Sequence, residues 1–225
     1  MYMESKIKWN EVDQYFNSKL LPSDSVLDAV LQANAEAGLP AIDVAPNQGK
    51  LLYLLAKMKG ARNILEIGTL GGYSSIWLAR ALPQDGQLIT LEYEQAFAHI
   101  AEENLKRAGL DEKVQILVGP ALETLPTLTD KGMSGFDFIF IDADKLNNPH
   151  YLKWALELCN PGAIIIVDNV VRDGEVIKRE SDDDGVQGVR QLFDLLASEP
   201  RIEATAIQTV GSKGYDGFVL GVVKE

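Results

Sequence analysis

The sequence predicts an α/β domain built on a doubly wound, mostly parallel, seven-stranded β-sheet. Five short apolar runs alternate with stretches of helical periodicity between residues 63 and 196. Most of these runs are nearly continuous rather than alternating, which is typical of parallel strands covered on both faces. Two further runs end the sequence, and the segment between them is too short for a crossover helix, which indicates an antiparallel pair.

The five internal runs have the length of ordinary strands and are rich in Ile, Leu, Val and Phe. We expect strands at 63–67, 88–92, 114–118, 136–141 and 163–167. Alternation of strands and helices predicts right-handed crossovers and helices on both faces of the sheet. The two terminal runs, 205–210 and 217–223, are expected to form a hairpin around a turn at 211–216.

Three sets of apolar positions recur at helical spacing, and we interpret them as core-facing stripes. They are Leu27, Val30, Leu31 and Asn34; Ala96, Phe97, Ile100, Ala101, Asn104, Leu105 and Ala108; and Val186, Val189, Leu192, Phe193 and Leu196. The first set precedes the first strand, so residues 1–40 are expected to form an N-terminal helical extension.

Length and composition narrow the classes of function. The 225 residues fit a single domain spanning residues 1–225, and the formal net charge of −12 disfavours a broad nucleic-acid-binding face. A single cysteine, Cys159, excludes an internal disulfide and a cysteine-based zinc cluster. No stretch reaches the roughly 20 apolar residues of a membrane span, and no signal peptide is recognisable at the N-terminus. A cytoplasmic protein without a nucleic-acid or membrane partner is expected.

A glycine-rich turn follows the first strand and opens a helix. In the run from Leu65 to Ser75, glycines let the backbone turn sharply and approach a ligand closely. A dinucleotide fingerprint would need a glycine at position 70, where Leu70 stands, and no Gly-Lys-Ser/Thr follows for a P-loop.

Two carboxylates accompany this turn. Glu66, just inside the first strand, would repel a pyrophosphate but can accept a hydrogen bond from an ammonium or hydroxyl group. Glu92, at the tip of the second strand, is placed to accept from both hydroxyls of a ribose. This pattern favours a nucleoside that carries a cation rather than phosphates, and S-adenosylmethionine is such a ligand.

A second acidic cluster follows the fourth and fifth strands. Asp142, Asp168 and Asn169 should meet beyond the carboxyl ends of the strands, where open α/β sheets bind ligands. Three oxygen ligands suit a hard divalent cation such as Mg²⁺. Lys145 lies at the mouth of the same crevice. A partly desolvated lysine close to a metal can lose its proton and act as a general base.

At these residues the sequence resembles the cation-dependent, class I S-adenosylmethionine-dependent O-methyltransferases. This family includes plant caffeoyl-coenzyme A enzymes, animal catechol O-methyltransferase and small bacterial relatives, and the bacterial branch is the most similar. The resemblance runs from about residue 40 to the C-terminus and is carried by 43–50, 65–74, 141–145, 167–176 and 211–217. It implies a Rossmann-like sheet with a reversed last strand, and a homodimer.

The resemblance also implies residue roles. The cofactor would be contacted by Val44, Glu66, Gly68, Tyr73, Ser74, Glu92, Gly119, Pro120, Ala121 and Asp142. The divalent cation, Mg²⁺ with Mn²⁺ or Ca²⁺ as alternatives, would be held by Asp142, Asp168 and Asn169. Lys145 matches the family's proposed catalytic base, and 172–188 is where the family builds a substrate lid.

The implied reaction is methyl transfer from S-adenosylmethionine to a hydroxyl of a vicinal-dihydroxy phenolic of catechol, hydroxycinnamoyl or flavonoid type. One departure is that no acid stands near Val210, where the animal catechol enzyme has a glutamate that orients the second hydroxyl. The alternatives are a metal-independent small-molecule methyltransferase, a nicotinamide oxidoreductase and a non-catalytic cofactor-binding module. The first of these leaves the trio of Asp142, Asp168 and Asn169 unexplained.

Overall fold

A seven-stranded sheet in the order β3-β2-β1-β4-β5-β7-β6 forms the centre of the computed structural model, which describes residues 2–225 and, from residue 4 onward, their side chains. The strands are β1 (Asn63–Ile67), β2 (Gln87–Glu92), β3 (Val114–Val118), β4 (Phe136–Ile141), β5 (Cys159–Asp168), β6 (Ile202–Gly211) and β7 (Gly214–Val223). The first five pair in parallel, whereas β7 is antiparallel to both β5 and β6. This confirms the predicted fold class.

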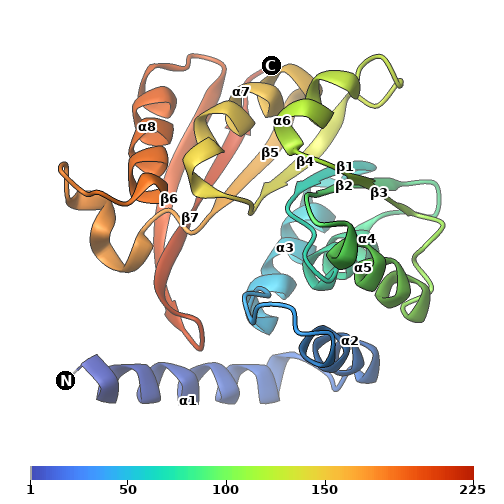
Figure 1. Cartoon of the computed structure of the whole chain (residues 1–225), viewed down its shortest axis with the longest axis vertical. Helices are drawn as coiled ribbons and strands as arrows, with labels where there is room; N and C mark the ends of the chain where they lie inside the picture. Colours follow the sequence, from blue (N-terminus) through green and yellow to red (C-terminus); the bar gives the residue numbers. More distant parts are fainter. Residues whose placement is uncertain (1) are drawn as a thin grey trace.

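Helices cover both faces of the sheet (Figure 1). They are α1 (Tyr2–Leu20), α2 (Ser25–Glu36), α3 (Pro46–Lys59), α4 (Tyr73–Ala81), α5 (Gln95–Arg107), α6 (Ala121–Thr124), α7 (Asn148–Leu158) and α8 (Asp184–Ser198). Helices α2 to α5 pack into one apolar cluster and α7 and α8 into the other. None of the helices within residues 2–225 combines the length and apolar character that crossing a membrane requires.

The strand β4 shows why the apolar runs are continuous. Phe138 and Phe140 belong to the cluster on the α2–α5 side, whereas Ile139 and Ile141 belong to the cluster on the α7–α8 side. Successive side chains of a strand point to opposite faces, so a strand covered on both faces needs apolar residues at every position. The central strands are thereby fixed in the middle of the domain, and their carboxyl ends are free to carry polar groups.

The C-terminal hairpin differs from expectation in its turn. We predicted a turn over 211–216, but Val210 pairs with Tyr215 and Gly211 with Gly214, so only Ser212 and Lys213 lie outside the ladder. Gly214 has φ +99°, a conformation that glycine adopts readily. Because Gly214 lets the chain reverse over Ser212 and Lys213 alone, the other residues of the predicted turn belong to the two strands.

Other predicted bounds shift for local reasons. The strand β5 begins at Cys159 rather than at residue 163, because its start pairs with Phe136 across a register shift. On α5 the predicted Ala101, Asn104 and Leu105 are buried, but at the start of the helix Ala98 is buried in place of the predicted Ala96, which is exposed. Within 172–188, a 3₁₀ segment covers Arg172–Ile177 and α8 begins at Asp184, leaving only 178–183 as a loop.

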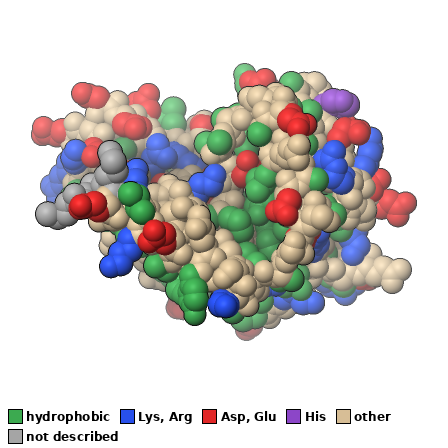
Figure 2. Space-filling view, turned by 90° about the horizontal axis from the view of Figure 1, so that it is seen from below, with side chains coloured by type: hydrophobic (Ala, Val, Ile, Leu, Met, Phe, Trp, Pro, Cys, Tyr) green, Lys and Arg blue, Asp and Glu red, His purple; other side chains and the backbone are tan. Residues whose placement is uncertain are grey.

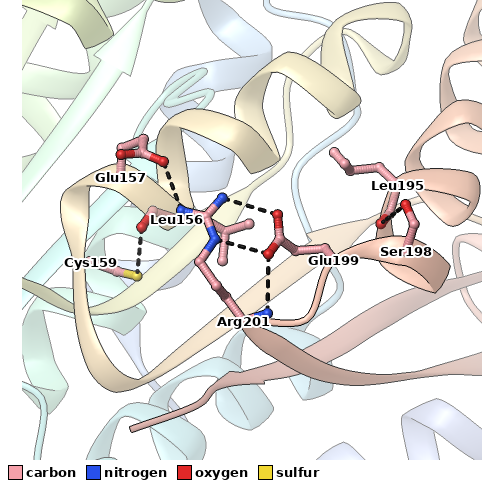
Figure 3. A network of polar contacts seen from close by, with 7 residues as sticks. All are labelled: Leu156, Glu157, Cys159, Leu195, Ser198, Glu199 and Arg201. Atoms are coloured by element: carbon pink, nitrogen blue, oxygen red, sulfur yellow. Dashed lines mark hydrogen bonds and ion pairs between the residues drawn. The ribbon is translucent and has the colours of Figure 1, made fainter.

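An arginine network fixes the end of the sheet where β5 and β6 begin (Figure 3). Arg201 donates from Nη1 to Glu157 Oε1 at 2.7 Å and from Nε to Glu199 Oε1 at 2.9 Å. The side-chain and backbone hydrogen bonds that Arg201 donates to Glu199 lower the pKa of Glu199 to about 2. The network joins the end of α7 to the connection between α8 and β6, at the opposite end of the strands from the acidic residues that follow β4 and β5.

Candidate active site

A cavity of about 770 Å³ lies beyond the carboxyl ends of the parallel strands, between the loops that follow them. Figure 2 views the molecule from below Figure 1, where apolar side chains gather in a hollow surrounded by charged ones. Of the predicted site residues, the cavity is lined by Val44, Gly68, Tyr73, Ser74, Glu92, Gly119, Pro120, Ala121, Asp142, Lys145 and Asn169. Glu66 and Asp168 are not in its lining and are almost fully buried. The volume suits a small-molecule ligand.

The glycine turn after β1 depends on Gly68. Its φ is +102°, and a Cβ atom there would lie 2.3 Å from the carbonyl oxygen of Asp142. The missing side chain therefore allows the end of β1 to lie directly against the end of β4, where Asp142 begins the acidic cluster. The same turn continues through Leu70, at φ +51°, into α4, whose N-terminus has no capping side chain.

Glu92 at the end of β2 holds the glycine turn in place. Its Oε2 accepts the backbone N–H groups of Leu70 at 2.7 Å and Thr69 at 3.2 Å, and its Oε1 accepts that of Glu94 at 2.9 Å. A carboxylate offers about four lone-pair sites, so three are in use and Oε1 has room for one further donor. The carboxylate thus keeps an acceptor position for a ligand hydroxyl, and its expected contact with both ribose hydroxyls stays a prediction.

Glu66 lies beneath the cavity and is fully buried. Its carboxylate accepts hydrogen bonds from three hydroxyl groups, those of Ser74 at 2.6 Å, Thr90 at 2.7 Å and Ser75. Burial disfavours the charged form and raises the pKa of Glu66 to about 7, although the three hydroxyls oppose this effect. Ser75 and Thr90 were not predicted from the sequence, because short polar residues on a helix and a strand give no signal of a shared partner.

Replacing Glu66 with glutamine should flatten the dependence of stability on pH in the cofactor-free protein. The pKa of Glu66 is about 7 when folded against an ordinary value of 4.5. Between these values the folded state keeps a proton that the unfolded chain has released, so the free energy of unfolding falls as pH rises, by roughly 3–4 kcal/mol for the full shift.

Urea denaturation at pH 5 and pH 8 measures this difference, and Glu66→Gln should lose less stability than the wild type between the two. The exposed Glu112→Gln provides a matched control that should follow the wild type. An identical loss in wild type and Glu66→Gln would contradict the expectation.

The acidic cluster brings together the four residues predicted for it. Lys145 donates from Nζ to Asp142 Oδ1 at 2.6 Å, and its side chain is only 10% exposed. Asp168 Oδ1 accepts the backbone N–H of Asn169 at 2.8 Å, and Asn169 has φ +57°, which asparagine tolerates. Burial, followed by the charge of Asp142, raises the pKa of Asp168 to about 7, while Lys145 opposes the rise.

The donor chemistry of this cluster fits a hard divalent cation. Two carboxylates face each other closely enough for one to raise the pKa of the other, and a cation between them would relieve both desolvation and repulsion. Among residues 2–225 no three His, Cys, Asp or Glu side chains gather at one point as a metal site. A metal here would accordingly have two carboxylates and the Asn169 amide as ligands, with further positions for water or substrate.

Gln48 is a polar contact of this cluster that sequence reasoning missed. It lies on α3 and donates from Nε2 to Asp168 Oδ2 at 2.6 Å. The neighbouring Asn47 donates to Asp13 of α1 at 2.9 Å, and Asp13 also accepts the backbone N–H of Ser212 at 2.7 Å. Both α3 residues lie in the 43–50 segment, but a single sequence contains no signal that pairs them with partners so distant along the chain.

Two asparagines on the predicted helical stripes support the glycine turn from the other side. Asn104 of α5 donates from Nδ2 to the carbonyl oxygen of Gly71 and to Asn34 Oδ1, each at 2.9 Å. Asn34 in turn donates to Asp43 Oδ1 at 2.9 Å. A Cβ at Gly71 would lie 2.0 Å from Asn34 Oδ1, so a glycine is required at this contact. Asn34 and Asn104 thus stabilise the glycine turn through hydrogen bonds, although both lie on helical stripes of otherwise apolar residues.

Comparisons with known proteins identify the family of this chain. A profile of the O-methyltransferase family matches residues 18–221. A catechol O-methyltransferase of Niastella koreensis is 50% identical over 216 residues, covering 96% of this chain and 98% of that protein.

Two solved structures agree over nearly the whole chain. The O-methyltransferase of Bacillus cereus in complex with SAH is 57% identical with a TM-score of 0.96, covering 97% of this chain and 100% of that one. TomG of Streptomyces achromogenes, an O-methyltransferase involved in tomaymycin synthesis and in complex with SAM, is 51% identical with a TM-score of 0.95, covering 98% and 99%. The present chain thus belongs to the O-methyltransferase family and is an S-adenosylmethionine-dependent O-methyltransferase.

Proposed function

We propose that this enzyme methylates one hydroxyl of a vicinal-dihydroxy phenolic and that the reaction depends on a divalent cation. The observation that carries the proposal is the meeting of Asp142, Asp168 and Asn169 at the ends of β4 and β5, with Lys145 bonded to Asp142. A metal with open positions can bind two adjacent oxygens of one acceptor. The name of the Niastella koreensis relative, a catechol O-methyltransferase, supports the same acceptor class.

The cofactor would lie along the loops after β1, β2 and β3. Gly68, Tyr73 and Ser74 would lie along its methionine part with Val44, and the uncapped N-terminus of α4 offers N–H groups to a carboxylate. Oε1 of Glu92 would accept from the ribose, and Gly119, Pro120 and Ala121 would face the adenine. Glu66 would act from beneath through the hydroxyl of Ser74.

The chain's residues would prepare the acceptor for in-line attack on the methyl group. A cation at the Asp142 cluster would lower the pKa of the bound phenolic hydroxyl and fix its position. Lys145 Nζ, beside Asp142 Oδ1, would take the proton released from that hydroxyl. Bound S-adenosylmethionine would supply the methyl group, with its C–S bond breaking as the C–O bond to the acceptor forms. We also propose that residues 172–188 cover the acceptor and exclude water, since Arg172 lines the cavity.

Metal removal tests the proposal directly. Methyl transfer to a panel of vicinal-dihydroxy phenolics should be abolished by EDTA and restored by added Mg²⁺, Mn²⁺ or Ca²⁺. Asp168→Asn should lose activity at every metal concentration while retaining SAH binding in calorimetry, and the exposed Asp130→Asn should behave as wild type. Turnover that is indifferent to EDTA would instead favour a metal-independent small-molecule methyltransferase.

A further inference from the structure

Arg172 follows β5 and lines the large cavity together with Lys145 and Asn169. It also borders a second hollow of about 280 Å³, which is lined in part by Asp183, Lys213 and Tyr215. Arg172 therefore lies at the end of the cavity where the acceptor would bind. We propose that its guanidinium binds an anionic substituent, a carboxylate in the first instance, on the phenolic acceptor; this inference rests on the proposed function.

The backbone of Arg172 is held in a conformation that arginine rarely adopts. Arg172 and Asp173 have φ of +57° and +55°, in the left-handed region. Asp216 of β7 fixes this turn, because its Oδ1 accepts the backbone N–H groups of Val171 at 2.9 Å and Arg172 at 3.0 Å. Strained non-glycine residues persist where the surrounding structure imposes them, and they concentrate at functional sites. The turn thus directs one particular side chain, a guanidinium, to the cavity.

One donor of the guanidinium, Nε, lacks a partner among the residues whose side chains the structure describes. This Nε is buried without a hydrogen bond, and no ion pair within residues 2–225 includes Arg172. The two other half-buried arginines behave differently: Arg80 pairs with Asp24, and Arg190 donates to the carbonyl oxygen of Val176 at 2.7 Å. A buried charged donor without an acceptor is costly, so an acceptor supplied by a ligand would satisfy it.

The position of the side chain suits an acceptor held by the acidic cluster. Arg172 Nη2 lies 3.9 Å, and Lys145 Cβ 3.5 Å, from the same point, the place of a Cβ on Gly185. Asp183 Oδ1 lies 3.0 Å from the same point, so the guanidinium faces the start of α8, on the side where the Lys145 side chain leaves the backbone. Glu175 and Asp183 also line the neighbouring hollow, but Glu175 pairs with Lys178 and Asp183 Oδ1 accepts the backbone N–H groups of Gly185 and Val186. Arginine binds carboxylates through two parallel hydrogen bonds, which gives both affinity and orientation.

Two acceptors of nearly the same size and shape, one anionic and one neutral, test the proposal. For 3,4-dihydroxybenzoate, Arg172→Gln should lower kcat/KM by about 10–100-fold, mostly through KM, since a charge-assisted pair is lost. For neutral 3,4-dihydroxybenzamide the change should stay within about 3-fold. Arg172→Lys should recover part of the loss. Arg62→Gln, which removes an exposed arginine at the start of β1, should leave both acceptors unaffected.

SAH binding, measured by calorimetry, first shows that the variants are folded. An equal loss for both acceptors, or a wild-type enzyme that does not prefer the benzoate, would overturn the role of Arg172 and leave the proposed function standing. Failure of the wild type to methylate either acceptor with metal present, despite SAH binding, would overturn the proposed function and this inference with it.

Discussion

Replacing Lys145 with alanine is expected to lower kcat by about 10²–10⁴-fold, the usual contribution of a positioned general base. Lys145 is 10% exposed, and its Nζ contacts Asp142 Oδ1 at 2.6 Å, so it is next to the proposed acceptor site. The Kd for SAH, measured by calorimetry, should change by less than about 3-fold, because the residues proposed to bind the cofactor lie mainly on the loops after β1, β2 and β3.

Lys145→Arg separates the two possible roles of this side chain. Arginine keeps a cation beside Asp142, but its guanidinium does not release a proton near neutral pH. If Lys145 is the base, Lys145→Arg should be nearly as slow as Lys145→Ala, and an added small amine should partly restore the turnover of the alanine variant. Equal losses of kcat and of cofactor affinity in Lys145→Ala would assign the residue a structural role instead.

Replacing Gly68 with alanine is expected to lower the free energy of unfolding by about 2–5 kcal/mol, from overpacking and backbone strain together. The new Cβ would lie 2.3 Å from a backbone oxygen of Asp142, and φ is +102°. Since backbone cannot rotate away as a side chain can, β1 and β4 would have to separate at their carboxyl ends. Cofactor affinity should fall with stability, because the same turn lines the cavity.

Gly60→Ala provides the matched control for this experiment. Gly60 also has a positive φ, +67°, but a Cβ there would meet nothing within 4 Å. Its cost should be about 1 kcal/mol, without an effect on SAH binding. Urea denaturation and calorimetry on both variants measure the difference. A Gly68→Ala variant as mild as Gly60→Ala would show that the ends of β1 and β4 can separate freely.

The central sheet could be predicted from sequence because its strands are buried on both faces. Phe136–Ile141 and Asn63–Ile67 have the predicted bounds, since burial on both faces makes most of their inner positions apolar. The hairpin turn was misplaced because Gly214 and Asp216 are turn-forming residues that here continue a ladder. Turn-forming residue types predict a turn correctly only where their backbone groups are not hydrogen-bonded to a neighbouring strand.

The candidate site was predictable in its ligand-facing residues but not in their supports. Asp142 and Asp168 follow strands whose order places them together, so topology alone brings them close. Gln48 reaches Asp168 from a different layer of the fold, and Asp216 fixes Arg172 from the reversed strand. Contacts between distant segments depend on how helices and hairpin pack, which periodicity along one chain does not encode.

The reversal of β7 has a practical consequence for protein engineering. The strand β7 runs antiparallel to β5, so the chain's last residues lie at the end of the strands opposite the cavity. The hairpin tip lies at the other end, towards α1 (Figure 1). A fluorescent reporter or an immobilising linker joined after Glu225 would project away from the mouth of the cavity. The N-terminal helix is the poorer attachment point, because its Asp13 contacts both Asn47 of α3 and the hairpin tip.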